Sequence, residues 1–253
     1  MNFCISGNQP QEILSQANQI KFRYSDLGHY LDSIHLYPSA HFILEISPKD
    51  SPDIPLLESC ASKAPLTLAL NSLAAIPQTL PYYWNYPITT FYDLRSLLSL
   101  PTPPSYILID APLSFSLPKI KQITQIPLRL CPNLAYDPYI PNKNGIYGSW
   151  VRPEDTSLYS QYIDTFEFAH ESLSQERVLF ETYQKEYWPG NLNLLITNLK
   201  VNVDNRAIPE ELGERRIKCG QRCMETPTCD LCATSLKYAN AIRNLHYKNK
   251  NHT

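Results

Sequence analysis

The clearest chemical signal in the sequence is a run of four cysteines, CGQRCMETPTCDLC, at positions 219–232. Cys219, Cys223, Cys229 and Cys232 follow the spacing C-x3-C-x5-C-x2-C, with mostly polar residues between them. Ordinary buried thiols need apolar neighbours, whereas cysteine pairs at this spacing are typical of metal sites. The sequence therefore predicts one metal centre on these four side chains.

The spacing leaves the identity of the metal open. Zn²⁺ takes four thiolates in a tetrahedral site, and a 4Fe-4S cluster also takes four and can draw them from one short loop. Because four protein ligands complete either coordination sphere, the centre is expected to stabilise the fold rather than to catalyse. The six histidines show no metal-ligand clustering, which argues against a catalytic metal held by histidine.

Composition predicts a globular, cytoplasmic protein. The chain has 253 residues, of which 43% are hydrophobic and 18% charged, and neither a signal peptide nor an 18-residue apolar run is present, so no membrane span is expected. The net charge of −2 gives no overall attraction to nucleic acid. From Arg215 onward, however, eight Lys or Arg face only Glu225 and Asp230, so this basic C-terminal segment could contact nucleic acid.

Short apolar runs alternate with helical or proline-rich connectors, as in α/β proteins with a parallel sheet. The Ser172 and Gln175 pair predicts a capping box at the start of a helix. The runs are residues 20–25, 41–47, 66–72, 86–92, 106–112, 126–133, 146–154 and 164–168. Eight runs predict a compact (β/α)8 TIM-like barrel over residues 1–190, and residues 191–253 then form a mostly helical module that contains the cysteines.

An open, doubly wound sheet with fewer strands is the alternative fold. Residues 20–188 allow only about 21 residues per βα unit, which is short for a barrel that usually needs about 250 residues. Several helices of the barrel must therefore be single turns.

Polar residues recur where the predicted strands end. In a parallel barrel these ends converge on one mouth, where carboxylates can transfer protons and arginines can bind anions. Mutual ion pairing inside the barrel is the alternative, because an isolated buried charge is costly. Asp26 and Asp155 directly precede helical patterns and are expected to be helix caps. The predicted site residues are Arg23, Glu45, Asp110, Arg129, Arg152 and Glu167.

A small barrel with polar strand ends, the strand PLRLCPN and four clustered cysteines resembles the collagenase-like peptidase family, whose relatives include iron-sulfur proteins of tRNA and ubiquinone hydroxylation. The resemblance covers residues 20–170 at the level of organisation. It implies a TIM-like barrel enzyme, but in that family the cluster cysteines are dispersed around the barrel, whereas here they follow it in one segment. No functional residue is carried over.

Two functions follow from these observations. The first is a metal-stabilised barrel enzyme that acts on a small anionic or nucleic-acid-linked substrate at the strand ends. The second is a non-enzymatic binding protein, in which the barrel is a scaffold and the basic cysteine module contacts nucleic acid or a protein. The recurrence of polar residues at strand ends favours the enzyme.

Overall fold

The computed structural model describes residues 1–71, 79–111, 113–135, 149–199 and 202–219, and the chain divides into two compact units. The first unit comprises residues 1–109, 125–130 and 163–180, and the remaining residues belong to the second. The two units alternate along the chain, whereas the sequence predicted a single boundary near residue 190.

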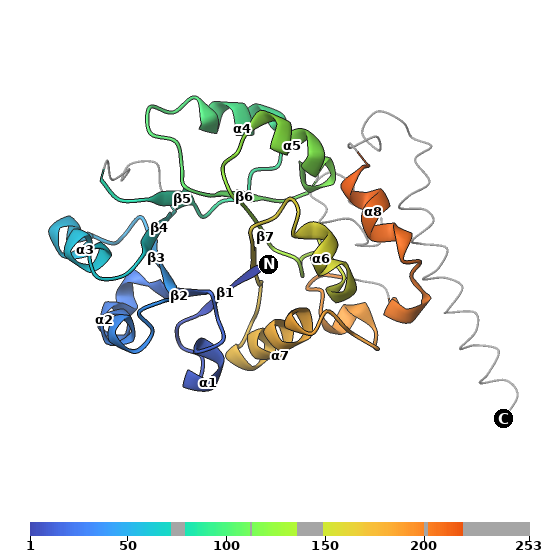
Figure 1. The fold of residues 1–253 in the computed structure, drawn as a ribbon, viewed down its shortest axis with the longest axis horizontal. Coiled ribbons are helices and arrows are strands. Elements are labelled where there is room, and N and C mark those ends of the chain that lie inside the picture. Colours follow the sequence, from blue (N-terminus) through green and yellow to red (C-terminus); the bar gives the residue numbers. More distant parts are fainter. Residues whose placement is uncertain (72–78, 112, 136–148, 200–201, 220–253) are drawn as a thin grey trace, which may run out of the picture. The chain divides into compact units, whose positions relative to one another are not determined.

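The eight strands of the described residues belong to the first unit and pair in parallel, in the order β5-β4-β3-β2-β1-β8-β7-β6. Figure 1 labels seven of them, β1 to β7. The outer strands approach each other through two backbone bonds, from Ser105 N–H to the Tyr82 carbonyl and from Ile88 N–H to the Leu108 carbonyl, both 2.7 Å. The sheet is thus a nearly closed barrel, as predicted. The strands are β1 (Asn2–Ser6), β2 (Gln19–Arg23), β3 (His41–Ile46), β4 (Leu66–Leu70), β5 (Tyr82–Trp84), β6 (Ile107–Ile109), β7 (Leu128–Leu130) and β8 (Thr165–Glu167).

Six of the eight predicted runs contain a strand, and two do not. In the run 86–92, Thr90 accepts a hydrogen bond from Asp93 N–H at 3.0 Å and begins a helix, so that only Ile88 bridges to a neighbouring strand. In the run 146–154, the described residues 149–154 form no strand, because Pro153 starts a 3-10 turn.

The two strands that the sequence pattern missed are short. In β1, polar Asn2 and Ser6 leave an apolar run of only three residues. In β5, three aromatic residues follow Pro81, which has no N–H and joins the sheet by accepting a bond from Leu68 N–H at 2.8 Å.

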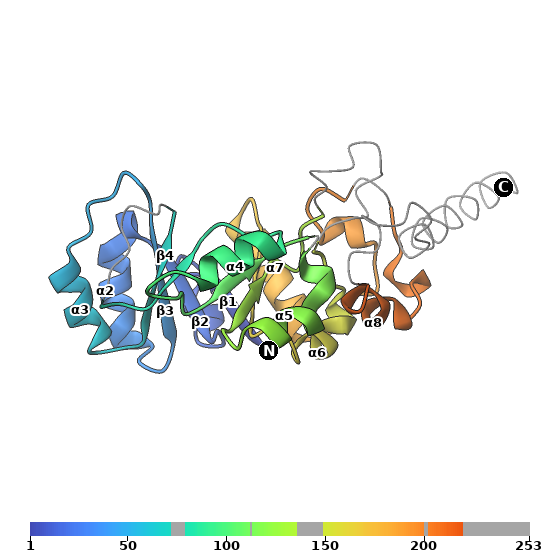
Figure 2. The same ribbon diagram turned by 90° about the horizontal axis from the view of Figure 1, so that it is seen from above.

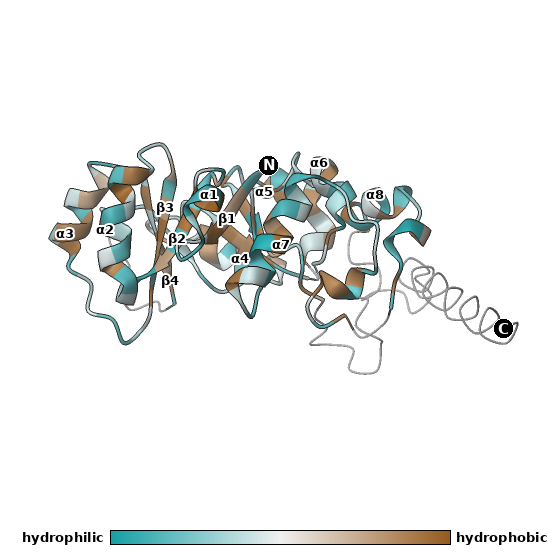
Figure 3. Ribbon diagram, turned by 90° about the horizontal axis from the view of Figure 1, so that it is seen from below, coloured by the Kyte–Doolittle hydropathy of each residue, from teal (hydrophilic) through white to brown (hydrophobic). Residues whose placement is uncertain are grey.

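Helices cover the outside of the barrel in the first unit. Figures 1 and 2 show α2 and α3 beside β2, β3 and β4. On α2, Tyr30 is fully buried and packs edge-to-face against Phe22 of β2 and Phe42 of β3. The strands are mostly brown in Figure 3, whereas α2 alternates between hydrophilic and hydrophobic colours, as expected for a helix with one buried face. The α-helices of the described residues, in both units, are α1 (Gln11–Leu14), α2 (Leu27–Leu36), α3 (Ile54–Ala61), α4 (Phe91–Leu98), α5 (Leu117–Ile123), α6 (Thr156–Tyr159), α7 (Leu173–Gln184) and α8 (Glu211–Ile217).

The barrel interior combines a small apolar cluster with charged residues. Cys4, Ile43, Ala69 and Tyr83 form the cluster, with Tyr106 packed against it. Because successive strand residues face opposite sides, Lys21, two residues before the end of β2, and Glu45, two residues after Ile43, also face inward. The interior therefore holds ionisable groups at the depth where strands end.

The second unit contains α5, α6 and α8 and is organised by a buried arginine. Arg152, only 4% exposed, donates two hydrogen bonds to Asp155 at 2.8 and 2.7 Å and reaches the Ile208 carbonyl at 3.3 Å. The mostly helical module predicted from residue 191 begins with a single 3-10 turn, Leu192–Leu194, and the left-handed backbone of Asn198, with a φ of 66°, is incompatible with a helix there. Within the described ranges, no helix is both long and apolar enough to span a bilayer.

Candidate functional site

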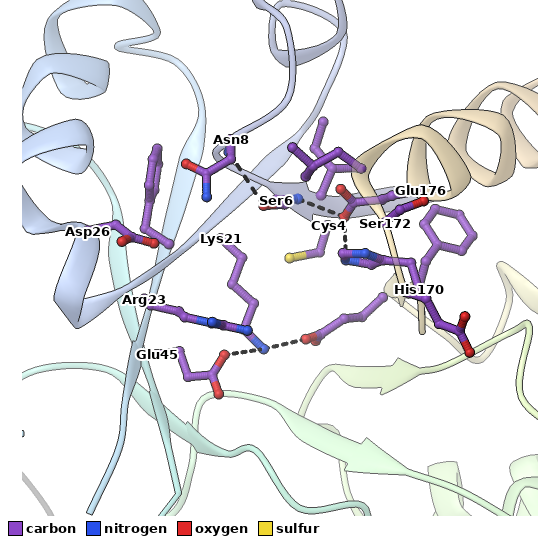
Figure 4. Close-up of a pocket in the computed structure, with 16 residues that line it drawn as sticks. Cys4, Ser6, Asn8, Lys21, Arg23, Asp26, Glu45, His170, Ser172 and Glu176 are labelled. Carbon is purple, nitrogen blue, oxygen red and sulfur yellow. Dashed lines mark hydrogen bonds and ion pairs between the residues drawn. The ribbon is translucent and has the colours of Figure 1, made fainter. Parts of the chain in front are cut away.

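A pocket of about 410 Å³ opens at the carboxyl end of the barrel. Figure 4 shows its lining residues, which come from the ends of β1, β2, β3 and β8 and from the loop and first turn of α7. We call it the mouth pocket. Its polar lining comprises Cys4, Ser6, Asn8, Lys21, Arg23, Asp26, Glu45, Glu167, His170, Glu171, Ser172 and Glu176.

Lys21 is the centre of an ion-pair network at the floor of the mouth pocket. Its Nζ lies 2.6 Å from Glu167 Oε1 and 3.5 Å from Glu45 Oε2, and it donates to Asn85 Oδ1 at 3.0 Å. Burial would lower the pKa of the ammonium group, but the two carboxylates raise it above its ordinary value, Glu167 most strongly. Lys21 is therefore a fixed positive charge and not an amine nucleophile.

Arg129 is the second cation that pairs with Glu167. Its Nε lies 3.5 Å from Glu167 Oε2, its Nη2 donates to Gln19 Oε1 at 2.5 Å, and its guanidinium lies 4.6 Å from the ring centroid of Tyr83. The contact with Glu167 is an ion pair rather than a hydrogen bond, because Nε has no hydrogen-bond partner among the described residues. Arg129 is fully buried, so it positions Glu167 and does not reach the pocket.

The two cations determine the protonation of Glu167. Burial alone would raise the pKa of its carboxyl, but Lys21 and Arg129 outweigh that effect and hold the pKa at about 2. Burial raises the pKa of the neighbouring Cys4 thiol to about 12. At neutral pH, Glu167 is therefore a carboxylate and Cys4 a thiol, which excludes Cys4 as a thiolate nucleophile in this state.

Glu45 is the more accessible carboxylate of the network. Its side chain is 27% exposed, against 17% for Glu167. Its Oε1 accepts hydrogen bonds from Asn71 Nδ2 at 2.9 Å and Asn85 Nδ2 at 3.1 Å. The other oxygen lies 3.5 Å from Lys21, a longer contact than the 2.6 Å between Lys21 and Glu167.

A histidine–carboxylate pair forms the opposite wall. His170 Nε2 lies 3.4 Å from Glu176 Oε1, which also accepts from Ser6 N–H at 2.8 Å. Gln9 Nε2 donates to Glu176 Oε2 at 2.6 Å. Glu176 is 2% exposed and held by these donors, whereas 27% of the His170 side chain is exposed. A fixed carboxylate that orients an imidazole is the arrangement that supports general acid–base catalysis.

Sequence reasoning missed His170 and Glu176, because no short histidine motif marks them. The available signal was positional: His170 lies three residues after the end of β8, and Glu176 lies in the first turn of α7. The predicted capping box forms in part: Ser172 Oγ accepts from Gln175 N–H at 3.3 Å, but Gln175 Oε1 accepts from the N–H of Glu171, at 2.7 Å, instead of that of Ser172.

The mouth pocket brings together three of the six predicted site residues, Arg23, Glu45 and Glu167. Asp110 and Arg152 belong to the second unit. Asp110 Oδ1 accepts from Ala111 N–H at 2.6 Å, and burial raises its pKa. Arg152 uses its donors on Asp155 and on carbonyl groups of the same unit, which indicates a structural role for it.

The two side-chain helix caps predicted at Asp26 and Asp155 do not form. Asp26 and Asp155 occupy N-cap positions of α2 and α6, but neither makes a side-chain hydrogen bond to the helix. Asp26 lines the mouth pocket, and Asp155 pairs with Arg152.

Of the four metal-site cysteines, only Cys219 lies within the described residues. It follows α8, and its N–H donates to the Arg216 carbonyl at 3.2 Å. Cys223, Cys229 and Cys232 lie outside, so the metal centre stays a prediction. In the part of the chain that the structure describes, no three His, Cys, Asp or Glu side chains are grouped to hold a metal ion.

The basic C-terminal segment is described only as far as Cys219. Within it, Arg216 is 7% exposed and its guanidinium lies 3.9 Å from a ring centroid of Trp150 and 5.2 Å from that of Phe115. Lys218 pairs with Glu214 on the surface. Arg216 is therefore a packing residue of the second unit and unsuited to contact phosphate.

Comparison with known proteins identifies no relative: no family model, no curated protein and no solved structure matches this chain.

Proposed function

We propose that the barrel is an enzyme that performs acid–base chemistry on a small polar molecule in the mouth pocket. One observation carries the proposal: the His170–Glu176 pair and the Lys21–Glu45–Glu167 network line the same pocket at the carboxyl end of a parallel barrel. That end is where barrels of this type place their active sites.

His170 is the general base. When its Nε2–H faces Glu176, the neutral ring leaves Nδ1 as the proton acceptor. Glu176 keeps the ring in one orientation and stabilises the imidazolium that forms, because its own oxygens are held by Ser6 and Gln9. Glu45, which can exchange its long contact with Lys21, is the second acid–base group.

Lys21 stabilises negative charge that develops on the substrate. Its ammonium group is already fixed by Glu167 and Asn85, so no large rearrangement is needed when the reaction occurs. Glu167 remains ionised throughout and positions Lys21 rather than exchanging protons.

The charge of the pocket selects the substrate class. Lys21 and Arg23 face five carboxylates, those of Asp26, Glu45, Glu167, Glu171 and Glu176. This excess of negative charge favours a neutral or amine-bearing molecule over the anionic substrate that the sequence analysis predicted. The family resemblance and the second hypothesis, a binding protein without turnover, remain predictions.

The test is a comparison of wild type and His170→Gln on a panel of small amines, alcohols and amino sugars, with consumption followed by NMR. We expect wild type to convert at least one compound and His170→Gln to lower kcat by about 10²- to 10⁴-fold. His35→Gln, on the exposed side of α2, is the control and should retain full turnover.

Undiminished turnover in His170→Gln would remove His170 from the mechanism. Compounds that bind wild type in the mouth pocket without being converted would favour the binding-protein hypothesis.

A further inference from the structure

A second pocket of about 450 Å³ lies at the same end of the barrel. Its residues come from the ends of β4 and β5, from the segment after β5, and from α4 and the residues after it. We call it the tryptophan pocket. It is lined chiefly by Asn71, Trp84, Tyr86, Ile88, Leu97 and Leu100.

The two pockets are neighbours in the barrel. The mouth pocket covers the ends of β8, β1, β2 and β3, and the tryptophan pocket covers β4 and β5, which continue the same strand order. At the end of β5 the chain alternates sides: Trp84 lines the tryptophan pocket, and the next residue, Asn85, bonds to Lys21 and Glu45 of the mouth pocket.

Asn71 joins the pockets directly. It lines the tryptophan pocket, its Nδ2 donates to Glu45 Oε1 at 2.9 Å, and its Oδ1 accepts from Asn85 Nδ2 at 3.0 Å. A molecule that fills the tryptophan pocket therefore contacts a residue that holds the acid–base group Glu45.

The tryptophan pocket suits an uncharged ring. Asp93 is its only charged lining residue, and that carboxylate already accepts from Thr90 Oγ1 at 2.6 Å at the start of α4. The indole of Trp84 is almost buried, and the phenol of Tyr86 is 59% exposed and able to stack on a ligand.

We propose that the substrate has two parts: an amine- or hydroxyl-bearing head that reacts in the mouth pocket, and an uncharged, preferably aromatic, ring that binds in the tryptophan pocket. The inference rests on the proposed function for the head, whereas binding of the ring depends on the tryptophan pocket alone.

The experiment measures calorimetric Kd values of the full chain for three probes: phenol as the ring alone, ethylamine as the head alone, and tyramine as both. We expect tyramine to bind at least tenfold more tightly than either part. Tyr86→Ala should weaken phenol and tyramine about tenfold and leave ethylamine unchanged. Because Tyr86 is exposed, this variant should keep the wild-type fold.

Two further variants complete the test. Tyr92→Ala removes an aromatic ring from α4, a helix that lines the pocket, at a position that is 79% exposed and outside the lining, and should change no Kd. Ser96→Trp places a large side chain at the pocket and should weaken phenol as Tyr86→Ala does.

Equal phenol affinity in wild type, Tyr86→Ala and Ser96→Trp would overturn the ring site. Tyramine that binds no better than phenol would overturn the two-part substrate. The phenol measurements are independent of the proposed function, because His170→Gln should lower kcat and leave the phenol Kd unchanged.

Discussion

Glu167 balances the charges inside the barrel. It is the carboxylate nearest to Lys21 and the one that pairs with the fully buried Arg129. A buried cation without a partner costs several kcal/mol, so the position of one carboxylate determines whether both cations are tolerated. Of the two residues that transfer protons in our proposal, Glu45 also pairs with Lys21, at 3.5 Å, whereas His170 pairs with Glu176.

Glu167→Gln should lower the free energy of unfolding by about 3 kcal/mol at pH 7, because Arg129 and Lys21 lose their shared counter-charge. The folded-state pKa of Glu167, about 2, lies below its ordinary value of 4.5. The carboxylate therefore stabilises the protein fully above pH 4.5, and this contribution disappears as the pH falls toward 2. Urea unfolding at pH 7 and pH 3 measures the difference in free energy of unfolding between wild type and Glu167→Gln. This difference should be smaller at pH 3 than at pH 7.

Glu12→Gln is the control, because Glu12 is 64% exposed and pairs with Arg177 at 3.1 Å on the surface. It should change stability by at most about 0.5 kcal/mol at either pH. If the stability lost in Glu167→Gln did not depend on pH, the variant would be destabilised by altered packing and not by the missing charge.

At the scale of elements, the approach of β1 to β2 forms the floor of the mouth pocket. Gly7 directly follows β1, and its N–H donates to the Lys21 carbonyl at 2.7 Å. A Cβ at Gly7 would lie 2.1 Å from the nearest atom of the Phe22 ring, which is buried between β2 and α2. Because Gly7 has no side chain, β1 can approach β2 closely enough for Ser6 and Lys21 to line the same pocket.

Gly7→Ala should therefore destabilise the protein by about 1–3 kcal/mol, because the Phe22 ring or the β1 backbone must move. Gly28→Ala is the matched variant. Gly28 lies in α2, where an added Cβ would meet no neighbouring group within 4 Å, so the substitution should stabilise the protein by about 0.5–1 kcal/mol. Thermal unfolding of both variants checks the prediction. Opposite signs are expected, and a neutral Gly7→Ala would mean that Phe22 moves at little cost.

At the scale of the whole molecule, the two compact units alternate along the chain, so each draws on segments from several parts of the sequence. The second unit contains α8, which leads directly into the cysteine segment. Its buried pair Arg152–Asp155 packs against Gly213 of α8, where a Cβ would lie 2.5 Å from the Asp155 carboxyl. The first turn of α8 is thus packed closely against this pair.

Cys229→Ser should lower the bound metal from about one centre per chain and increase proteolysis within the C-terminal module, because a segment with so little apolar content depends on metal ligation for its stability. Metal analysis and the absorption spectrum of protein purified without oxygen measure the first effect. Absorbance near 400 nm with iron would indicate a cluster, and colourless protein with zinc would indicate a structural zinc site.

Cys60→Ser, a change at a buried thiol of α3, is the control and should leave the metal content unchanged. Unchanged metal content in Cys229→Ser would refute the assignment.

The sequence by itself determined the parallel barrel and half of the predicted site, because runs buried on both faces must pair with each other and their polar ends then meet. Arg23, Glu45 and Glu167 could be found in this way. The tertiary structure alone decided which charges reach the pocket. Arg129 and Glu167 both lie in or at the end of apolar strands, yet Glu167 lines the pocket, whereas Arg129 is fully buried and pairs with it. It also decided the His170–Glu176 wall, because Ser6 and Gln9 reach Glu176 only through the pairing of β1 with β8, across about 170 residues of sequence. Local patterns report burial and periodicity, whereas contacts between the two ends of a chain arise only when the strands pair.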